Sequence, residues 1–194
     1  LSKQTHTTNI RIVTESDAGK GIICERDFDD TDGLITDVPG ITLVTQFADC
    51  TGLLFCDPKK RVIAASHAGW RGTAGEIGRL TVEKMHDSFG CDPGDIRAGI
   101  APSIGPCCFE VDQPVIDQFE KIKSYDVSKV IKDEGNGKYH VDLWKANCLS
   151  LLSAGLREEN ISVTDICTKC NSDVFFSHRV TGFDRGNLAA LICL

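Results

Sequence analysis

Two short segments of the sequence each present a side chain that could bind a metal or act as a nucleophile. Cys50 closes the segment Phe47–Cys50, and His67 lies in the segment Ser66–Gly72. Each segment begins where a strand-like run ends, and strand ends beside glycine are places where backbone and polar side chains can reach a ligand. A paired cysteine and histidine permit either a histidine-activated thiolate nucleophile or a zinc site. Spacing alone does not choose between these two chemistries.

Three further side chains are candidates for the same site. His6 lies near the start of the chain, where a lone histidine is usually solvated, so it matters only as a third ligand. Arg71 comes just before an expected helix, whose N-terminus suits a phosphate or carboxylate group. Its guanidinium would add a charge-assisted hydrogen bond to such an anion. Arg179 follows the aromatic run Phe175–Ser177 and again suits an anion.

The chain contains ten cysteines, which is many for 194 residues. Because the first residues do not resemble a secretory signal, reduced thiols and a cytoplasmic location are expected instead of a disulfide framework. Adjacent side chains usually point apart, so at most one of Cys107 and Cys108 is predicted to face a site. The pair Cys167 and Cys170 has CxxC spacing, but without a matching second pair it gives little support for a structural zinc site.

The elements that position these side chains alternate between strands and helices. Alternating or buried apolar runs predict strands at Asn9–Val13, Ile41–Thr45 and Arg61–Ser66, with Asp57–Lys60 as the turn of a hairpin. This hairpin would bring the two chemical segments close together. Further strands are predicted at Arg97–Ile100, Phe175–Ser177 and Leu188–Leu194.

Helical periodicity and end signals predict three helices. The first runs over Thr73–Phe89 and ends at Gly90, the second follows Asp112 with Pro114 in its first turn, and the third covers Leu143–Ala154. The pattern favours a mixed sheet with helices packed outside it. With 41% hydrophobic residues, the 194 residues are expected to form a single domain.

The charge balance limits the kinds of partner. A net charge of −7 argues against nucleic acid and against a membrane surface, both of which demand a basic face. No apolar stretch approaches the roughly 20 residues of a membrane helix. The sequence begins with Leu1, so residues before it are expected to be missing. Oligomeric state is left open.

Taken together and in this order, these segments resemble the YfiH family, known under the names polyphenol oxidase (laccase) and purine nucleoside phosphorylase. The resemblance runs through essentially the whole chain. It is carried by Gln4–His6, Ala48–Cys50, His67–Gly72, Ala101–Val111, Asp142–Asn147, Cys167–Thr168 and Phe175–Arg179. The chain departs from the family pattern at Gly52, where proline is common, and at Val180, where a second arginine is common. Members also normally carry further N-terminal strands.

The resemblance implies a fold and a metal site. The implied fold is α+β, a four-layer αββα sandwich with mixed sheets, related to the catalytic domain of cytotoxic necrotizing factors. The implied zinc ligands are His6, Cys50 and His67, and copper is the alternative metal. Three protein ligands with an open fourth position are typical of a catalytic zinc.

The implied activities are phosphorolysis of adenosine, inosine, guanosine and methylthioadenosine, and deamination of adenosine. Purine nucleosides and phosphate are then the small-molecule partners. Within this hypothesis, Arg71 and Arg179 hold phosphate or ribose, and Asp49 orients a ligand or accepts a proton.

Three other functions fit parts of the same pattern. A copper-dependent polyphenol oxidase is one, although laccase chemistry needs several coppers and many histidines, and this chain has five scattered histidines. A metal-free hydrolase using Cys50 and His67 would survive chelators and be inactivated by alkylation. A metal-binding protein without catalytic activity would hold zinc tightly and turn over no nucleoside.

Overall fold

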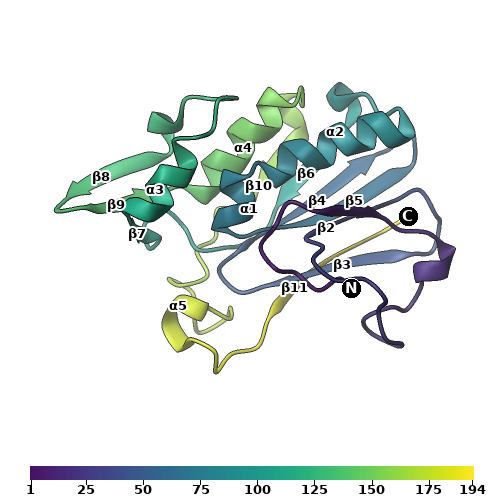
Figure 1. Ribbon diagram of the computed structural model, residues 1–194, viewed down its shortest axis with the longest axis horizontal. Helices are drawn as coiled ribbons and strands as arrows, with labels where there is room; N and C mark the ends of the chain where they lie inside the picture. Colours follow the sequence, from purple (N-terminus) through teal and green to yellow (C-terminus); the bar gives the residue numbers. More distant parts are fainter.

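A mixed six-stranded sheet forms the centre of the computed structural model, which describes residues 1–194 (Figure 1). Neighbouring strands are parallel at its two edges and antiparallel in its centre. In spatial order the strands are β1 (Ile10–Ile12), β2 (Gly33–Thr36), β5 (Val62–Ala68), β4 (Thr51–Asp57), β6 (Arg97–Ile100) and β10 (Ile161–Val163). All seven residues of β5 are buried, because both faces of the sheet are covered.

Helices cover one face of this sheet (Figure 1). They are α1 (Trp70–Ala74), α2 (Ile77–Phe89) and α4 (Leu143–Ser153). The main hydrophobic core lies between them and the sheet, where Leu53, Phe55, Ile77, Met85 and Leu151 are fully buried. This arrangement explains why the apolar residues of α2 recur at helical spacing.

A two-stranded antiparallel sheet covers the opposite face. It consists of β3 (Thr42–Phe47) and β11 (Leu188–Cys193). A smaller core fills the space between the two sheets and includes Leu43, Ile63 and Ala65. The layers are therefore helices, six-stranded sheet and two-stranded sheet.

A third sheet extends beside α3 (Gln113–Phe119) at one end of the molecule (Figure 1). Its strands are β7 (Glu110–Asp112), β9 (Lys138–Val141) and β8 (Ile131–Gly135). The remaining elements are single turns: 3-10 turns at Glu15–Asp17, Pro93–Asp95, Val127–Lys129 and Glu158–Asn160, and α5 (His178–Thr181).

The α+β class with mixed pairing is confirmed, whereas the expected fourth layer differs from what the structure shows. Both long helices, α2 and α4, pack against each other on the same face, so residues 1–194 form no second helical layer outside β3 and β11. The relation to cytotoxic necrotizing factors stays a prediction. No helix has the length and apolar character that crossing a membrane requires.

Three local predictions need correction. The hairpin partner of β5 is β4, not the predicted strand at Ile41–Thr45, which pairs with β11. The predicted first helix is interrupted at Glu76, whose φ of 57° is left-handed, and therefore appears as α1 and α2. The segment Phe175–Ser177 is no strand, because the Phe175 amide bonds back to the Asn171 carbonyl in a turn. The helix ends predicted at Gly90 and after Asp112 are confirmed.

Candidate metal centre

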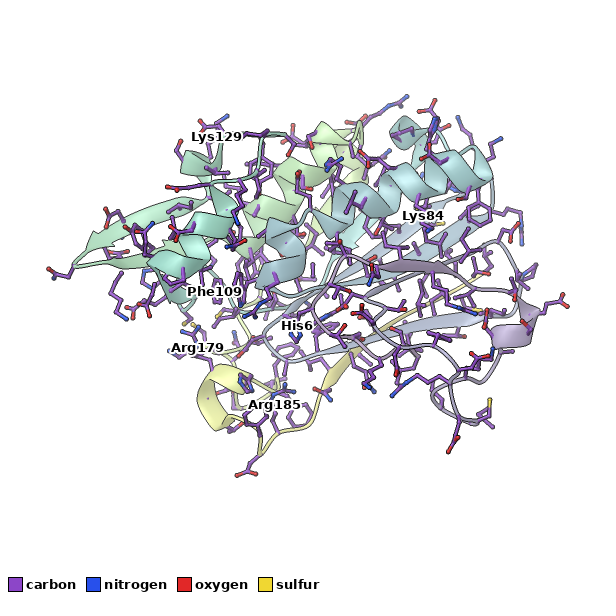
Figure 2. All side chains as sticks on the ribbon, viewed as in Figure 1. His6, Lys84, Phe109, Lys129, Arg179 and Arg185 are labelled. Carbon is purple, nitrogen blue, oxygen red and sulfur yellow. The ribbon has the colours of Figure 1, made fainter.

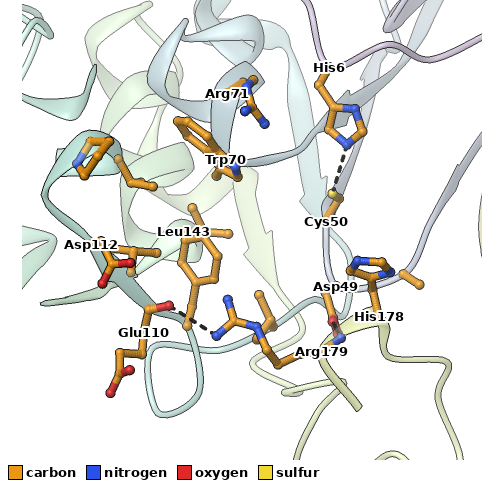
Figure 3. Close-up of a pocket in the computed structure, with 16 residues that line it drawn as sticks. His6, Asp49, Cys50, Trp70, Arg71, Glu110, Asp112, Leu143, His178 and Arg179 are labelled. Carbon is orange, nitrogen blue, oxygen red and sulfur yellow. Dashed lines mark hydrogen bonds between the residues drawn. The ribbon is translucent and has the colours of Figure 1, made fainter. Parts of the chain in front are cut away.

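Three side chains from separate parts of the chain converge at one end of the central sheet. Cys50 directly precedes β4, His67 lies in β5 opposite Gly52, and His6 belongs to the segment before β1. One donor atom from each lies within 4.8 Å of the other two. The Cys50 Sγ and His6 Nε2 atoms are 3.8 Å apart (Figure 3). The antiparallel pairing of β4 and β5 thus accounts for two of the three donors, and a segment far away in sequence supplies the third.

Asp32, which the sequence analysis missed, holds the site together. This fully buried carboxylate immediately precedes β2 and accepts a 2.7 Å hydrogen bond from His67 Nδ1. It also accepts hydrogen bonds from the backbone amides of Thr5, His6 and Thr7 at 2.9–3.1 Å. One side chain therefore fixes the tautomer of His67 and the path of the segment that carries His6. A carboxylate bound to the second nitrogen of a ligating histidine is the usual support of a metal site.

Gln4 fastens the same segment to the edge of β3. Its side-chain amide donates to the Gln46 carbonyl at 2.6 Å and accepts from the Gln46 amide at 2.8 Å. His6 itself has a left-handed backbone with φ of 67°. Such strain in a residue other than glycine persists only where surrounding bonds impose it, and here Asp32 and Gln4 supply those bonds.

The electrostatics of the cluster favour a thiolate. Burial opposes ionisation of Cys50, but hydrogen bonds from His6 and His67 lower its pKa to about 6. Burial likewise disfavours a charged His67, yet Asp32 and Cys50 raise its pKa to about 9. Burial alone would raise the pKa of Asp32, but its bond with His67 and the backbone amides bring it to about 2. These pKa shifts favour an ionised Asp32, a protonated His67 and a thiolate at Cys50.

Gly69 leaves the space that two of the donors occupy. A Cβ at this position would lie 2.7 Å from His6 Cδ2 and 3.1 Å from Cys50 Sγ. Gly69 is also the residue before α1, so the first turn of that helix passes directly beside the cluster. This close approach explains why glycine precedes Trp70 at this point in the sequence.

Asp49 anchors the C-terminal loops and makes no hydrogen bond to the three donors. One of its oxygens accepts from Thr168 Oγ1 at 2.6 Å. The other accepts from Ser177 Oγ at 3.0 Å and from the Arg179 amide at 2.6 Å. Both carboxylate oxygens are thus engaged in positioning distant segments, while Asp32 orients His67.

A pocket of about 490 Å³ opens beside the cluster, a size suited to a small molecule. Its wall includes His6 and Cys50 together with the aromatic rings of Trp70 and Phe109. Figure 2 labels His6, Phe109 and Arg179, which come from the N-terminal segment, the loop before β7 and α5. The pocket therefore lies where the central sheet, the small sheet and the C-terminal loops meet.

Charged side chains line the same pocket (Figure 3). Arg71 lies with its guanidinium carbon 4.2 Å from the Trp70 ring centroid, and it forms no ion pair. Arg179 donates to the Glu110 carbonyl at 3.2 Å. Glu110 and His178 also line the pocket, and of these two Glu110 was not a candidate from the sequence. Both arginines therefore lie on the pocket wall.

Four cysteines outside this cluster also converge. One sulfur from each of Cys107, Cys108, Cys167 and Cys170 lies within 4.8 Å of the others. Cys107 and Cys108 both approach Cys170, so these adjacent side chains do not point apart as predicted. The CxxC pair, Cys167 and Cys170, therefore lies beside a second pair of cysteines, Cys107 and Cys108.

The fold and the cluster define a protein with a candidate metal site of three donors opening onto a small-molecule pocket. The chain belongs to the family described as multi-copper polyphenol oxidoreductase laccase, whose model matches residues 1–194. It is 38% identical to the purine nucleoside phosphorylase YlmD of Geobacillus stearothermophilus, over 98% of this chain and 70% of that protein. It is 34% identical to an adenosine deaminase, RL5, from an unknown prokaryotic organism, over 96% of this chain and 71% of that protein.

Solved structures share the fold. The Bacillus licheniformis protein YfiH superposes with a TM-score of 0.95 at 36% identity, covering 100% of this chain and 73% of that one. YlmD from Geobacillus stearothermophilus superposes with a TM-score of 0.91 at 37% identity, covering 99% of this chain and 72% of that one. The resemblance to the YfiH family is thus confirmed.

Proposed function

We propose that this chain is a zinc-dependent enzyme that phosphorolyses adenosine, inosine, guanosine and methylthioadenosine and deaminates adenosine. The observation that carries the proposal is the cluster of His6, Cys50 and His67 on the wall of a pocket that also presents two arginines. Relatives named purine nucleoside phosphorylase and adenosine deaminase give it further support.

The donor set fits zinc. Two imidazoles and one thiolate are ligands that Zn²⁺ prefers, and the hydrogen bond from His67 Nδ1 to Asp32 leaves Nε2 free as the donor atom. Three protein ligands leave a fourth position for water or substrate. When bound there, zinc supplies Lewis acidity at the pocket wall near neutral pH.

The chain's own residues account for substrate binding. The Trp70 and Phe109 rings contribute apolar surface to the pocket wall for a purine base. The guanidinium of Arg71, which forms no ion pair inside the chain, and that of Arg179 bind the phosphate that attacks the nucleoside. Glu110 contributes a carboxylate at the pocket wall, suited to accept hydrogen bonds from ribose hydroxyls.

We assign Asp49 a positioning role. Its two oxygens already receive three donors, including the backbone amide of Arg179. A carboxylate held in this way fixes the backbone position of Arg179. It is also poorly placed to take up a proton from substrate. Replacing it would move Arg179 and therefore act on phosphate binding.

One observation favours a second candidate, a metal-free thiol hydrolase. Cys50, His67 and Asp32 form a line of thiolate, imidazole and carboxylate, which is the arrangement of a nucleophile, its base and an orienting acid. This mechanism needs no metal and predicts that chelators have no effect.

The test incubates zinc-loaded protein with adenosine, with and without phosphate, and separates the products by chromatography. We expect adenine only when phosphate is present, and inosine in both samples, partly converted to hypoxanthine when phosphate is present. Both products should disappear in Cys50→Ala and after chelation, and persist in Cys193→Ala, an exposed cysteine on β11. Activity that survives chelation but not alkylation would support the hydrolase. Oxidation of a phenol by copper-loaded protein, without nucleoside turnover, would replace the proposal with the oxidase.

A further inference from the structure

A second cluster of possible metal ligands lies outside the site described above. Cys107 and Cys108 follow β6 on a loop, and Cys167 and Cys170 lie in a turn after β10. The Cys170 sulfur lies 3.6 Å from the sulfur of Cys107 and 3.5 Å from that of Cys108. All four sulfurs lie within 4.8 Å of one another, although roughly sixty residues separate the two pairs.

The backbone around these cysteines brings the loop of Cys107 and Cys108 close to the turn of Cys167 and Cys170. The Gly105 amide donates to the Cys167 sulfur at 3.2 Å. A Cβ at Gly105 would lie 2.7 Å from the Trp144 ring and 3.1 Å from Cys167 Cβ, so only glycine lets the loop come this close. The Thr168 amide bonds to the Ser103 carbonyl at 3.0 Å and ties the loop to the turn beside the cysteines. Backbone hydrogen bonds thus set the distance between the two pairs.

The loop geometry also explains how adjacent cysteines face one point. The amides of Cys108 and Phe109 both bond to the Gly105 carbonyl, at 2.9 and 3.0 Å, which closes a tight turn. In a turn of this kind, successive side chains do not alternate between opposite faces as they do in a strand. Cys107 and Cys108 therefore both approach Cys170.

We propose that Cys107, Cys108, Cys167 and Cys170 bind a second zinc ion that has a structural role. Tetrahedral zinc with Zn–S bonds of about 2.3 Å separates its sulfur ligands by about 3.8 Å, close to the two separations given above. A disulfide would need an S–S distance of about 2.05 Å. Four cysteines complete the tetrahedral shell and leave no position for water or substrate, which distinguishes this site from the one at Cys50. On binding, each thiol transfers its proton to solvent and its sulfur binds the metal.

Zinc at this position would fasten two pocket walls together. Cys108 is followed by Phe109 and Glu110, which line the pocket. Cys167 is followed by Thr168, whose hydroxyl donates to Asp49. The proposal concerns a second ion and is independent of which reaction the pocket carries out.

The experiment counts zinc per chain by elemental analysis after reduction, zinc loading and desalting. The wild-type protein is expected to hold two zinc ions, and Cys50→Ala one. Cys170→Ser, which changes an exposed residue, should also hold one, while the matched exposed control Cys193→Ser keeps two. A single zinc ion in the wild type that is lost in Cys50→Ala and kept in Cys170→Ser, or two zinc ions in Cys170→Ser, would overturn the proposal.

Cobalt substitution gives a second measurement, which does not depend on whether a variant of the four cysteines folds. Each Co–S bond adds to the sulfur-to-metal charge-transfer absorption, so a site of four thiolates should absorb about four times as strongly as the site with Cys50 alone. Zinc should also protect the four cysteines from alkylation, as read by mass spectrometry of peptides. Disulfide-linked or freely alkylated Cys107 and Cys170 in zinc-loaded protein would refute the site.

Discussion

Replacement of Asp32 by asparagine tests how the candidate metal centre is held. The Asp32 oxygen that accepts from His67 Nδ1 would become either an amide oxygen or an amide nitrogen. The other oxygen receives the amides of Thr5 and Thr7 and the Thr7 hydroxyl, so asparagine keeps its single oxygen there and turns its NH₂ group toward His67. The imidazole then accepts at Nδ1 and carries its proton on Nε2, the nitrogen that must bind the metal.

This change of tautomer is expected to lower the affinity for zinc. Loss of such an orienting partner lowers metal affinity by about 10- to 100-fold, which equals about 1.4–2.7 kcal/mol. The amide of His6 also loses its acceptor, and each buried group left unpaired costs about 1–3 kcal/mol of folding stability. We therefore expect weaker zinc binding together with a lower melting temperature.

The measurement is a zinc titration against a chromophoric chelator, carried out on chains with Cys170→Ser so that one site is counted. Asp57→Asn is the matched control, because this carboxylate is also fully buried but caps the turn between β4 and β5. The control should lose stability and keep its zinc affinity. If Asp32→Asn binds zinc within twofold of its parent, Asp32 does not orient His67 and the reasoning fails.

Three further predictions concern the same site. In metal-free protein, alkylation of Cys50 by iodoacetamide should rise as pH rises through about 6, well below the usual thiol range, and zinc should abolish it; a midpoint above pH 8 would contradict the lowered pKa. Gly69→Ala should weaken zinc binding at least about tenfold, because its Cβ meets two donors, whereas Gly99→Ala, with open space around it, should bind as wild type. Arg71→Ala should raise the KM for phosphate about 10- to 100-fold, because a charge-assisted hydrogen bond is lost. Initial rates at varied phosphate concentration measure this KM, and an unchanged value would show that Arg71 does not bind phosphate.

Much of the local structure could be predicted because its signals are local. Gly90 ends α2 with a left-handed φ of 66°, and Pro114 lies in the first turn of α3, as the sequence indicates. Strand partners are chosen by contacts far apart in the chain, and this is where prediction failed. Gly52 weakens β4 as a strand signal, yet it is required because a Cβ there would lie 2.4 Å from the Phe47 ring.

In the candidate site, too, residues with a local sequence signal were predicted, whereas those placed by distant contacts were not. Cys50 and His67 were candidates from residue type, and His6 gained interest only through the family resemblance. Asp32 carried no motif, and only the fold shows that its carboxylate is buried between a histidine and a backbone segment. The four-cysteine cluster was missed because its two pairs meet through a turn at Gly105 that reverses the expected direction of adjacent side chains.

The attachment of the N-terminal segment bears on how fast a bound ion could leave. Cys50 and His67 are held by the central sheet, whereas His6 is held through Gln4 and Asp32. Releasing that segment breaks a few hydrogen bonds and leaves the hydrophobic cores intact, so it requires only a local opening. Cys50 and His67 would stay in place during this opening, so the rate of metal exchange is expected to follow the opening and not global unfolding. The ion could be both tightly held at equilibrium and readily replaced.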